Sequence, residues 1–171
     1  MEQQAPRLII VAGANGSGKT TFAIPYTKAI GVQFLNADEL AKRYADRGED
    51  NAMIKGGREF FRLLNQALDM REDVVIETTL SGSYTSKVAR RARRNGYSVE
   101  VVYIFLGSEN QCVDRVRIRT RKGGHHVPEE DIRRRFGRSL LNFRFDLSEF
   151  ADVWFLYYNG GQSYQQVALK S

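Results

Sequence analysis

One eight-residue stretch near the N-terminus constrains this chain most strongly: Gly13-Ala14-Asn15-Gly16-Ser17-Gly18-Lys19-Thr20. It fits the pattern G-x-x-x-x-G-K-[ST] of a phosphate-binding loop, or P-loop. The apolar run Leu8-Ile9-Ile10-Val11 before the loop is typical of a buried parallel strand, and the residues from Lys19 onward can begin a helix. The sequence therefore predicts a strand, a loop and a helix whose N-terminus binds the phosphates of a nucleotide.

Two side chains of the loop have specific expected roles. Lys19 is expected to reach the β- and γ-phosphates, and the hydroxyl of Thr20 is expected to hold Mg²⁺. We therefore expect Mg²⁺ with ATP as the bound group; the alternative is a glycine-rich turn that binds nothing. The predicted ATP-binding residues are Gly13, Ala14, Asn15, Gly16, Ser17, Gly18, Lys19, Thr20 and Thr21.

Length and composition indicate one domain. A chain of 171 residues with 42% hydrophobic residues can bury one core, so we expect residues 1–171 to form a single domain behind a disordered tail at 1–6. We find no signal-peptide pattern and no apolar run of the ~20 residues that a membrane span needs. The single cysteine, Cys112, fits a reducing compartment. These features favour a cytoplasmic protein without a membrane partner.

The rest of the chain alternates between strand and helix patterns, which predicts right-handed βαβ units and a parallel sheet. The predicted strands are residues 8–11, 32–36, 74–76, 99–106 and 153–157, and the tail from Gln162 can add an edge strand. The predicted helices begin at Lys19 and cover 38–71, 84–94, 108–122 and a segment from Pro128. Within 38–71 we expect a break at Arg47-Gly48 and consider a second at Gly56-Gly57. The predicted fold class is α/β: a P-loop NTPase fold with a roughly five-stranded parallel sheet, helices on both faces and an arginine-rich lid hairpin at about 112–138.

Asp38 follows the second predicted strand directly. Ligands of such sheets bind outside the carboxyl ends of the strands, so Asp38 is expected near the γ-phosphate. A carboxylate there can orient and deprotonate an acceptor hydroxyl. The alternative is that Asp38 only stabilises a helix N-terminus. Asn36 and Glu39 can cap that helix themselves, which leaves Asp38 free for catalysis.

Glu77-Thr78-Thr79 ends the third predicted strand, where P-loop proteins often carry an acid that supports Mg²⁺. Because glutamate stands here in place of aspartate, a water-mediated metal contact and a contact with a substrate hydroxyl are both open. A polar turn without function is the alternative.

Positive charge is concentrated in residues 87–138, which carry 14 Lys and Arg against 6 Asp and Glu. We expect this region to face an anion, either polyphosphate or nucleic acid. Arg115 and Arg119 lie four apart on one helix face, and such a flap can place guanidinium groups on a phosphate during transfer. The alternative is a solvated basic face. His125 and His126 lack acidic or thiol neighbours, so we favour loop structure or substrate contact over a metal site.

These motifs follow one another in the order seen in zeta-toxin-like kinases, and the chain resembles the short branch of that family over nearly its whole length. The segments that carry the resemblance are residues 15–22, 36–39, 77–81, 123–128 and 133–142. The resemblance implies that Lys19 is the P-loop lysine, that Asp38 is the catalytic base, and that Glu77 and Thr79 hold substrate or metal. It also implies lid arginines near the transferred phosphate, for which Arg119 is the first candidate and Arg115 the second. The expected substrate-binding residues are Glu77, Thr79, His125, Arg133 and Arg134, and the expected metal ligands are Thr20 and Glu77.

Zeta toxins phosphorylate a hydroxyl of the amino sugar in UDP-N-acetylglucosamine, so the resemblance implies a phosphotransferase with this nucleotide-linked acceptor. Two departures from the family pattern leave the identity of the acceptor open. His125 falls near the position at which zeta toxins have an arginine, and the chain is shorter than well-known zeta toxins. Kinases of NAD or of an antibiotic hydroxyl are the next alternatives. An RNA-end kinase or nucleic-acid-binding NTPase is an alternative from another class, and an antitoxin protein is a further candidate partner.

Overall fold

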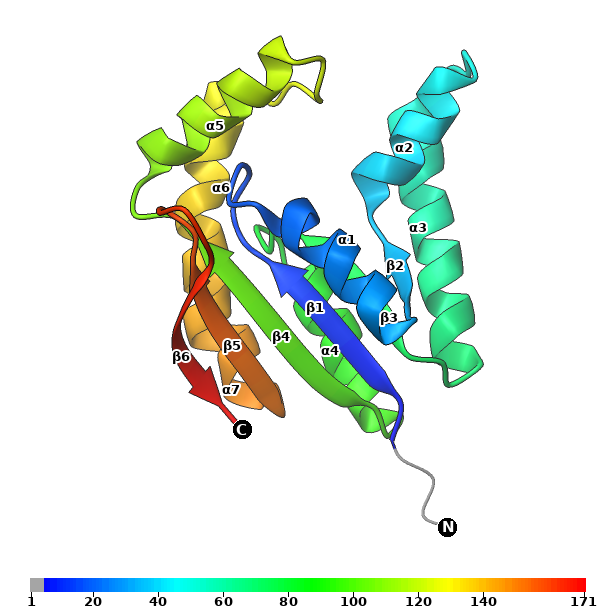
Figure 1. Cartoon of the computed structure of the whole chain (residues 1–171). Coiled ribbons are helices and arrows are strands. Elements are labelled where there is room, and N and C mark those ends of the chain that lie inside the picture. The colour runs from blue at the N-terminus through cyan, green and yellow to red at the C-terminus, as the bar shows by residue number, and fades with distance from the viewer. Residues whose placement is uncertain (1–4) are drawn as a thin grey trace.

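The structure, a computed structural model, describes residues 5–171, and the strands of these residues form one six-stranded sheet in the order β2-β3-β1-β4-β5-β6. The strands are β1 (Arg7–Ala12), β2 (Gln33–Leu35), β3 (Val74–Thr78), β4 (Ser98–Phe105), β5 (Val153–Tyr158) and β6 (Gln165–Lys170). Strands β1 to β5 are parallel, and β6 pairs antiparallel with β5 (Figure 1). The predicted α/β fold is confirmed, and the tail supplies the sixth strand.

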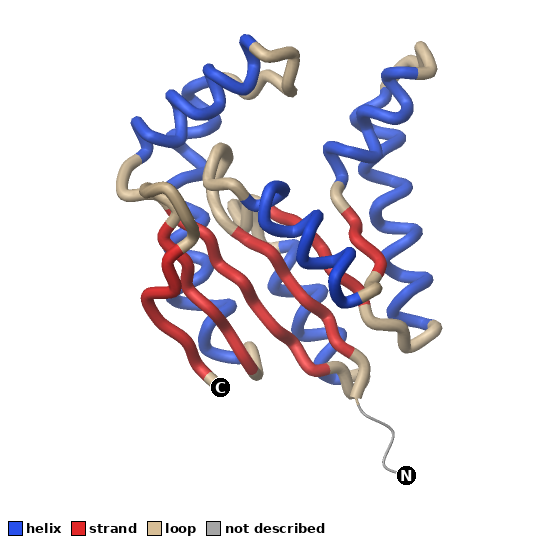
Figure 2. Tube along the Cα trace, in the orientation of Figure 1, coloured by secondary structure: helices blue, strands red, loops and turns tan. Residues whose placement is uncertain are grey.

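Helices cover both faces of the sheet. They are α1 (Lys19–Ile30), α2 (Ala37–Asp46), α3 (Ala52–Asp69), α4 (Tyr84–Arg94), α5 (Glu109–Arg121) and α6 (Glu129–Asn142), followed by the π-helix η1 (Phe143–Leu147) and α7 (Ser148–Phe150). Figure 1 shows α1 on one face, and α4, α6 and α7 on the other. Figure 2 shows the tan loop that follows β1 at the carboxyl end of that strand, and sheets of this kind bind ligands at the carboxyl ends of their strands.

The central strand β1 is buried on both faces, as its unbroken apolar run predicts. Leu8 and Ile10 join the core beneath α3 and α4, whereas Ile9 and Val11 join the core beneath α1. All four side chains have 0% exposure. The strand that leads into the P-loop is therefore packed on both faces.

Two helical arms rise beyond the carboxyl edge of the sheet, with the P-loop between them (Figure 1). One arm consists of α2 and α3, and the other of α5 and α6. The second arm has its own small core, which includes Cys112, Val116, Val127 and Ile132.

The break considered at Gly56-Gly57 is wrong, because α3 continues through both residues. Gly56 instead allows α2 and α3 to pack closely: a Cβ there would lie 2.4 Å from the backbone nitrogen of Ala41. Gly57, in contrast, has open space around it. The break at Arg47-Gly48 is confirmed, because α2 ends at Asp46 and α3 begins at Ala52.

The predicted N-terminal tail is partly outside the structure. Residues 1–4 lie outside the described residues, but Pro6 is buried and its carbonyl oxygen accepts a hydrogen bond from the Ser98 N–H at 2.9 Å. The prediction of disorder is therefore wrong for Pro6. None of the helices in residues 5–171 is both long enough and apolar enough to cross a membrane.

Candidate active site

The backbone of the P-loop depends on glycine. Gly13, Gly16 and Gly18 have φ values of 146°, 79° and 98°, which residues with a side chain rarely adopt. A Cβ on Gly13 would also lie 2.1 Å from the carbonyl oxygen of Ile104 on β4. The loop is therefore built to lie tightly against the neighbouring strand.

Lys19 is held against this loop. Its side chain is buried, and Nζ donates a hydrogen bond to the carbonyl oxygen of Ala14 at 2.9 Å. Burial lowers the pKa of Lys19, while the nearby carboxylates of Glu77 and Asp38 act in the opposite direction. A buried ammonium group beside the loop is a suitable partner for a phosphate.

Glu77, at the end of β3, joins the P-loop helix to the start of α2. One oxygen of its carboxylate accepts a hydrogen bond from the Thr20 hydroxyl at 3.0 Å, and the other accepts one from Asn36 Nδ2 at 2.9 Å. Burial raises the pKa of Glu77, although Lys19, Thr20 and Asn36 each lower it. The contact between Glu77 and Asn36 was not predicted from the sequence, which identified Asn36 only as a helix cap.

The donor set at Thr20 and Glu77 fits Mg²⁺. A hydroxyl and a carboxylate are hard oxygen ligands of the kind that Mg²⁺ prefers, and such sites use few protein ligands beside the phosphates. Within residues 5–171, no three His, Cys, Asp or Glu side chains gather into a metal-binding group. A metal held here would therefore depend on phosphate oxygens and water for its other ligands.

Asp38 lies in the first turn of α2. The side-chain oxygen of Asn36 accepts hydrogen bonds from the N–H groups of Asp38 at 2.8 Å and Glu39 at 3.2 Å, so Asn36 caps the helix as predicted. The side chain of Asp38 is exposed, and it is close enough to influence the pKa of both Lys19 and Glu77. The structure thus brings Lys19, Thr20, Glu77 and Asp38 together at one edge of the sheet.

The turn after Glu77 is fixed by several polar contacts. The Thr78 hydroxyl accepts a hydrogen bond from Leu80 N at 2.9 Å, and the Thr79 hydroxyl bonds to the Ser81 hydroxyl at 3.0 Å. Leu80 is fully buried with a φ of 54°, and its carbonyl oxygen accepts a hydrogen bond from Asn142 Nδ2 at 2.8 Å. Asn142 therefore anchors the turn that carries Thr79.

The two lid arginine candidates have different surroundings. Arg119 Nη2 donates to the carbonyl oxygen of His125 at 3.0 Å, and its charge acts to lower the pKa of Lys19. Arg115 Nη2 donates at 2.6 Å to the carbonyl oxygen of Asn159, in the loop between β5 and β6. Arg119 thus lies within electrostatic range of the P-loop lysine, whereas Arg115 holds a neighbouring loop.

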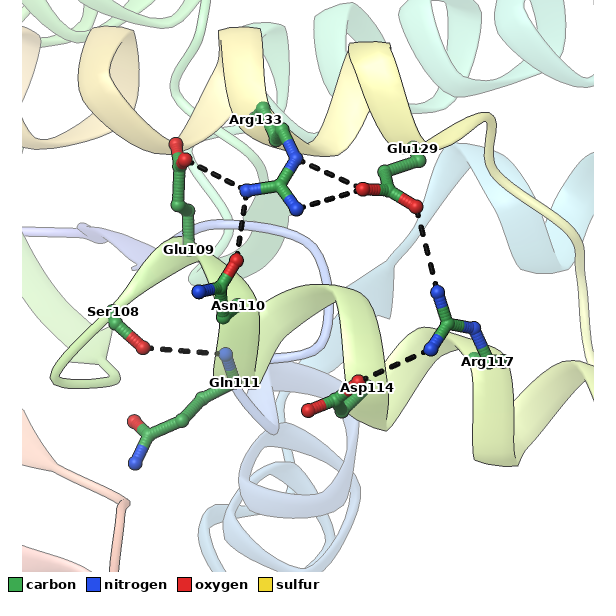
Figure 3. Close-up of polar contacts among 8 residues, drawn as sticks. All are labelled: Ser108, Glu109, Asn110, Gln111, Asp114, Arg117, Glu129 and Arg133. Atoms are coloured by element: carbon green, nitrogen blue, oxygen red, sulfur yellow. Dashed lines mark hydrogen bonds and ion pairs between the residues drawn. The ribbon is translucent and has the colours of Figure 1, made fainter.

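The predicted substrate residues Arg133 and Arg134 bind acidic groups. Figure 3 shows the Arg133 guanidinium between α5 and α6, where it donates to Glu109 and Glu129, each at 2.7 Å, and to Asn110 at 2.9 Å. Arg134 pairs with Asp131 on its own helix. These contacts stabilise the hairpin, and the expected contact of either arginine with substrate remains a prediction.

Several arginines of the positively charged segment 87–138 form ion pairs with acidic residues of the same chain. On α4, Arg90, Arg91 and Arg93 pair with Asp146, Asp69 and Asp152, respectively. The expectation that the whole segment 87–138 faces an anion is therefore wrong for this helix face, because its arginines bind acids from other elements.

The two histidines lie in the loop between α5 and α6. His125 presents its carbonyl oxygen to Arg119, and His126 lines a cavity of about 210 Å³ between the two helices, together with Val116, Arg117 and Ile132. This cavity is formed by residues 113–132 and includes none of the predicted ATP-binding residues.

Comparison with known proteins gives a family match over most of the chain. A family model described as "AAA domain" matches residues 8–137. A protein of uncharacterised function from Haemophilus influenzae is 27% identical over 130 residues, which are 76% of this chain and 92% of that protein.

Two solved structures show the same fold. The structure of AvrRxo1-ORF1:-ORF2 with ATP has a TM-score of 0.76 and 18% identity, with 96% of this chain and 58% of that chain covered. A chain from the PezAT chromosomal toxin–antitoxin system of Streptococcus pneumoniae has a TM-score of 0.71 and 17% identity, with 99% of this chain and 72% of that chain covered. This chain thus shares its α/β fold with both of these chains.

Proposed function

The chain belongs to the AAA domain family, and from this premise we propose that it is an ATP-dependent phosphotransferase of the zeta-toxin type. The proposed reaction transfers the γ-phosphoryl group to a hydroxyl of a small, nucleotide-linked acceptor. The amino sugar of UDP-N-acetylglucosamine is the leading candidate, because the motif order resembles that of the zeta toxins.

One observation carries this proposal: Glu77 hydrogen-bonds to Thr20 and Asn36, which places the start of α2, with Asp38, beside the P-loop. A protein that only binds ATP needs the loop and the lysine. A phosphotransferase also needs a carboxylate beside the γ-phosphate that can act on an acceptor hydroxyl. Asp38 is exposed, close to Lys19, and not needed as the helix cap, so it suits that role.

Each group of the site has a proposed part in the reaction. The P-loop and Lys19 hold the phosphates, Thr79 and His125 contact the acceptor, and Asp38 accepts the proton of the acceptor hydroxyl. The hydroxyl oxygen forms a bond to the γ-phosphorus as the bond to the bridging oxygen of ADP breaks, which yields ADP and a phosphate monoester. Arg119 neutralises charge on the transferred group. Thr20 and Glu77 would hold Mg²⁺, which neutralises phosphate charge when bound.

The test is an acceptor panel. The protein is incubated with γ-labelled ATP and Mg²⁺ together with UDP-sugars, NAD, a hydroxylated antibiotic or RNA, and the labelled product is identified. Label on the amino sugar of UDP-N-acetylglucosamine would support the leading assignment. Label on NAD or an antibiotic would keep the phosphotransferase and change its acceptor, and label on RNA ends would replace the small-molecule assignment.

An antitoxin protein is a second proposed partner. It is supported by the similarity of fold to a chain of the PezAT toxin–antitoxin system. Expression of the chain with and without the product of the neighbouring gene tests this: a partner that binds the chain and restores growth supports it, and unchanged growth in both cases contradicts it.

A further inference from the structure

Two side chains from the segment between β5 and β6, near the C-terminus of the chain, contact the backbone of the P-loop. Asn159 Nδ2 donates a hydrogen bond to the carbonyl oxygen of Ser17 at 2.8 Å, and the Tyr164 hydroxyl donates one to the carbonyl oxygen of Gly18 at 2.8 Å. The partners are 142 and 146 positions apart in the sequence. Both donors lie in or next to the loop between β5 and β6.

These contacts matter because of what a phosphate-binding loop must do. Its N–H groups must point toward the phosphate, so carbonyl groups of the same peptide units point away and need hydrogen-bond donors of their own. Ala14 O accepts from Ser17 N at 3.2 Å and from Lys19 Nζ at 2.9 Å, within the loop itself. The carbonyl of Ser17 receives the side-chain donor Asn159 from the opposite end of the chain. The carbonyl of Gly18 accepts from Phe22 N at 3.1 Å at the start of α1, and it accepts a second hydrogen bond from Tyr164.

The fit between the two segments is close. A Cβ on Gly18 would lie 2.4 Å from Asn159 Nδ2 and 3.0 Å from the Tyr164 hydroxyl oxygen. Gly18 is therefore required by the approach of these two side chains as well as by its φ of 98°.

Both donors are themselves held in place. The N–H of Asn159 donates to Phe105 O at 2.9 Å, and its carbonyl oxygen accepts from Arg115 Nη2 at 2.6 Å. The ring of Tyr164 packs edge-on against Phe22 of α1, with ring centres 5.5 Å apart.

We propose that Asn159 and Tyr164 are positioning residues that hold the P-loop in its phosphate-binding shape, and that Arg115 fixes the loop that carries Asn159. This inference rests on the proposed function, because it assigns the contacts a part in nucleotide binding. In this account Arg115 supports the loop that carries Asn159, which differs from the contact with the transferred phosphate expected of a lid arginine.

The expected effect is on affinity. The loop holds the phosphates in the ground state and the transition state alike, so a less ordered loop raises the KM for ATP and leaves kcat nearly unchanged. Loss of one neutral hydrogen bond is expected to weaken nucleotide binding by about 2–10-fold.

Tyr164→Phe is the main test variant, and Tyr157→Phe is its matched control. Tyr157 also packs against Phe22, with ring centres 5.6 Å apart, but its hydroxyl donates to Gln166 Oε1 at 3.1 Å. Each variant thus loses one hydroxyl from the same aromatic cluster, and only Tyr164→Phe loses a contact with the P-loop.

The measurement is the equilibrium dissociation constant for ATP, GTP and inorganic tripolyphosphate, each with Mg²⁺, alongside thermal unfolding without ligand. We expect Tyr164→Phe to weaken binding of all three ligands by a similar factor and Tyr157→Phe to bind like the wild type. A loss of affinity confined to ATP would overturn the inference, because Tyr164 would then contribute to binding of the adenine base and not to the shape of the P-loop. Equal losses in both variants would also overturn it, because they would reflect a general loosening of the aromatic cluster.

Lys19→Ala separates this inference from the proposed function. If the wild type binds none of the three ligands, the proposed function and the positioning role both fail. If the wild type binds them, Lys19→Ala does not, and Tyr164→Phe binds as well as the wild type, the positioning role alone is overturned.

Discussion

The carboxylate of Glu77 accepts a hydrogen bond from the Thr20 hydroxyl at 3.0 Å, although 57 positions separate the two residues in the sequence. Strand pairing explains the contact: Glu77 lies opposite Val11 in the parallel register of β1 and β3, just before the P-loop leaves β1. The end of β3 is therefore fixed beside the start of α1, and the two oxygen ligands expected for Mg²⁺ lie together.

The first prediction concerns this pair. Thr20→Val removes the hydroxyl and keeps the side-chain shape, so we expect the Mg²⁺ concentration for half-maximal turnover to rise by about tenfold or more. Thr20→Ser keeps a hydroxyl and should behave like the wild type. Turnover is measured across a Mg²⁺ titration at saturating ATP. Identical curves for Thr20→Val and the wild type would remove Thr20 from the metal site.

The second prediction concerns Lys19. Lys19→Ala should abolish detectable phosphoryl transfer, because it removes the ammonium group expected at the β- and γ-phosphates. The fold should persist, since burial already lowers the pKa of this lysine and a buried ammonium contributes little to stability. Turnover and circular dichroism of the variant test both parts. A folded variant with full turnover would exclude the P-loop from the mechanism.

The third prediction compares two adjacent glycines of α3. Gly56→Ala should destabilise the protein by about 1–3 kcal/mol, because the new methyl group collides with the backbone of α2 at Ala41. Gly57→Ala should stabilise it by up to ~1 kcal/mol, because open space surrounds Gly57 and alanine favours a helix. Denaturant unfolding measures both changes. Equal changes of the same sign would contradict the close packing of α2 and α3.

The fourth prediction concerns the lid. Arg119→Ala should lower kcat and kcat/KM together by ~10²-fold or more, because it removes a contact that we expect mainly in the transition state. Arg117→Ala is the control: Arg117 pairs with Asp114 and Glu129 at 3.3 and 3.5 Å on the exposed side of α5. Steady-state measurement of kcat and kcat/KM for both variants tests this prediction. Equal, mild losses would exclude the lid role, and a fall of about one unit in the salt slope of RNA binding in each variant would indicate a nucleic-acid surface instead.

Local patterns in the sequence predict much of this fold. The apolar run of β1 and the glycines of the P-loop each have a short-range signature, as does the helical spacing of the buried residues Phe60, Leu64 and Leu68 in α3. Helix α4 extends over Tyr84–Arg94 as predicted. Asn36 was identified as a cap because capping depends on neighbours in the chain.

Contacts between distant segments could not be predicted in this way. The pattern at Gly56-Gly57 fits a helix break as well as a close helix contact, and only the position of Ala41 distinguishes the two. The arginines of α4 suggested an anionic ligand, but their partners, such as Asp146 and Asp152, come from the far end of the chain. Asn159 and Tyr164 carried no motif at all, because their importance depends on the backbone that they meet.

The most direct test of the proposed function is Asp38→Asn, assayed for ATP affinity and for phosphoryl transfer to the acceptor that the panel identifies. The substitution is nearly isosteric, and it removes the negative charge of the side chain together with its ability to accept a proton. ATP affinity should therefore stay close to that of the wild type, while transfer should fall by ~10²–10⁴-fold. Loss of ATP binding together with activity would make Asp38 a metal-binding or structural residue, and full transfer by the variant would contradict its assignment as the catalytic base.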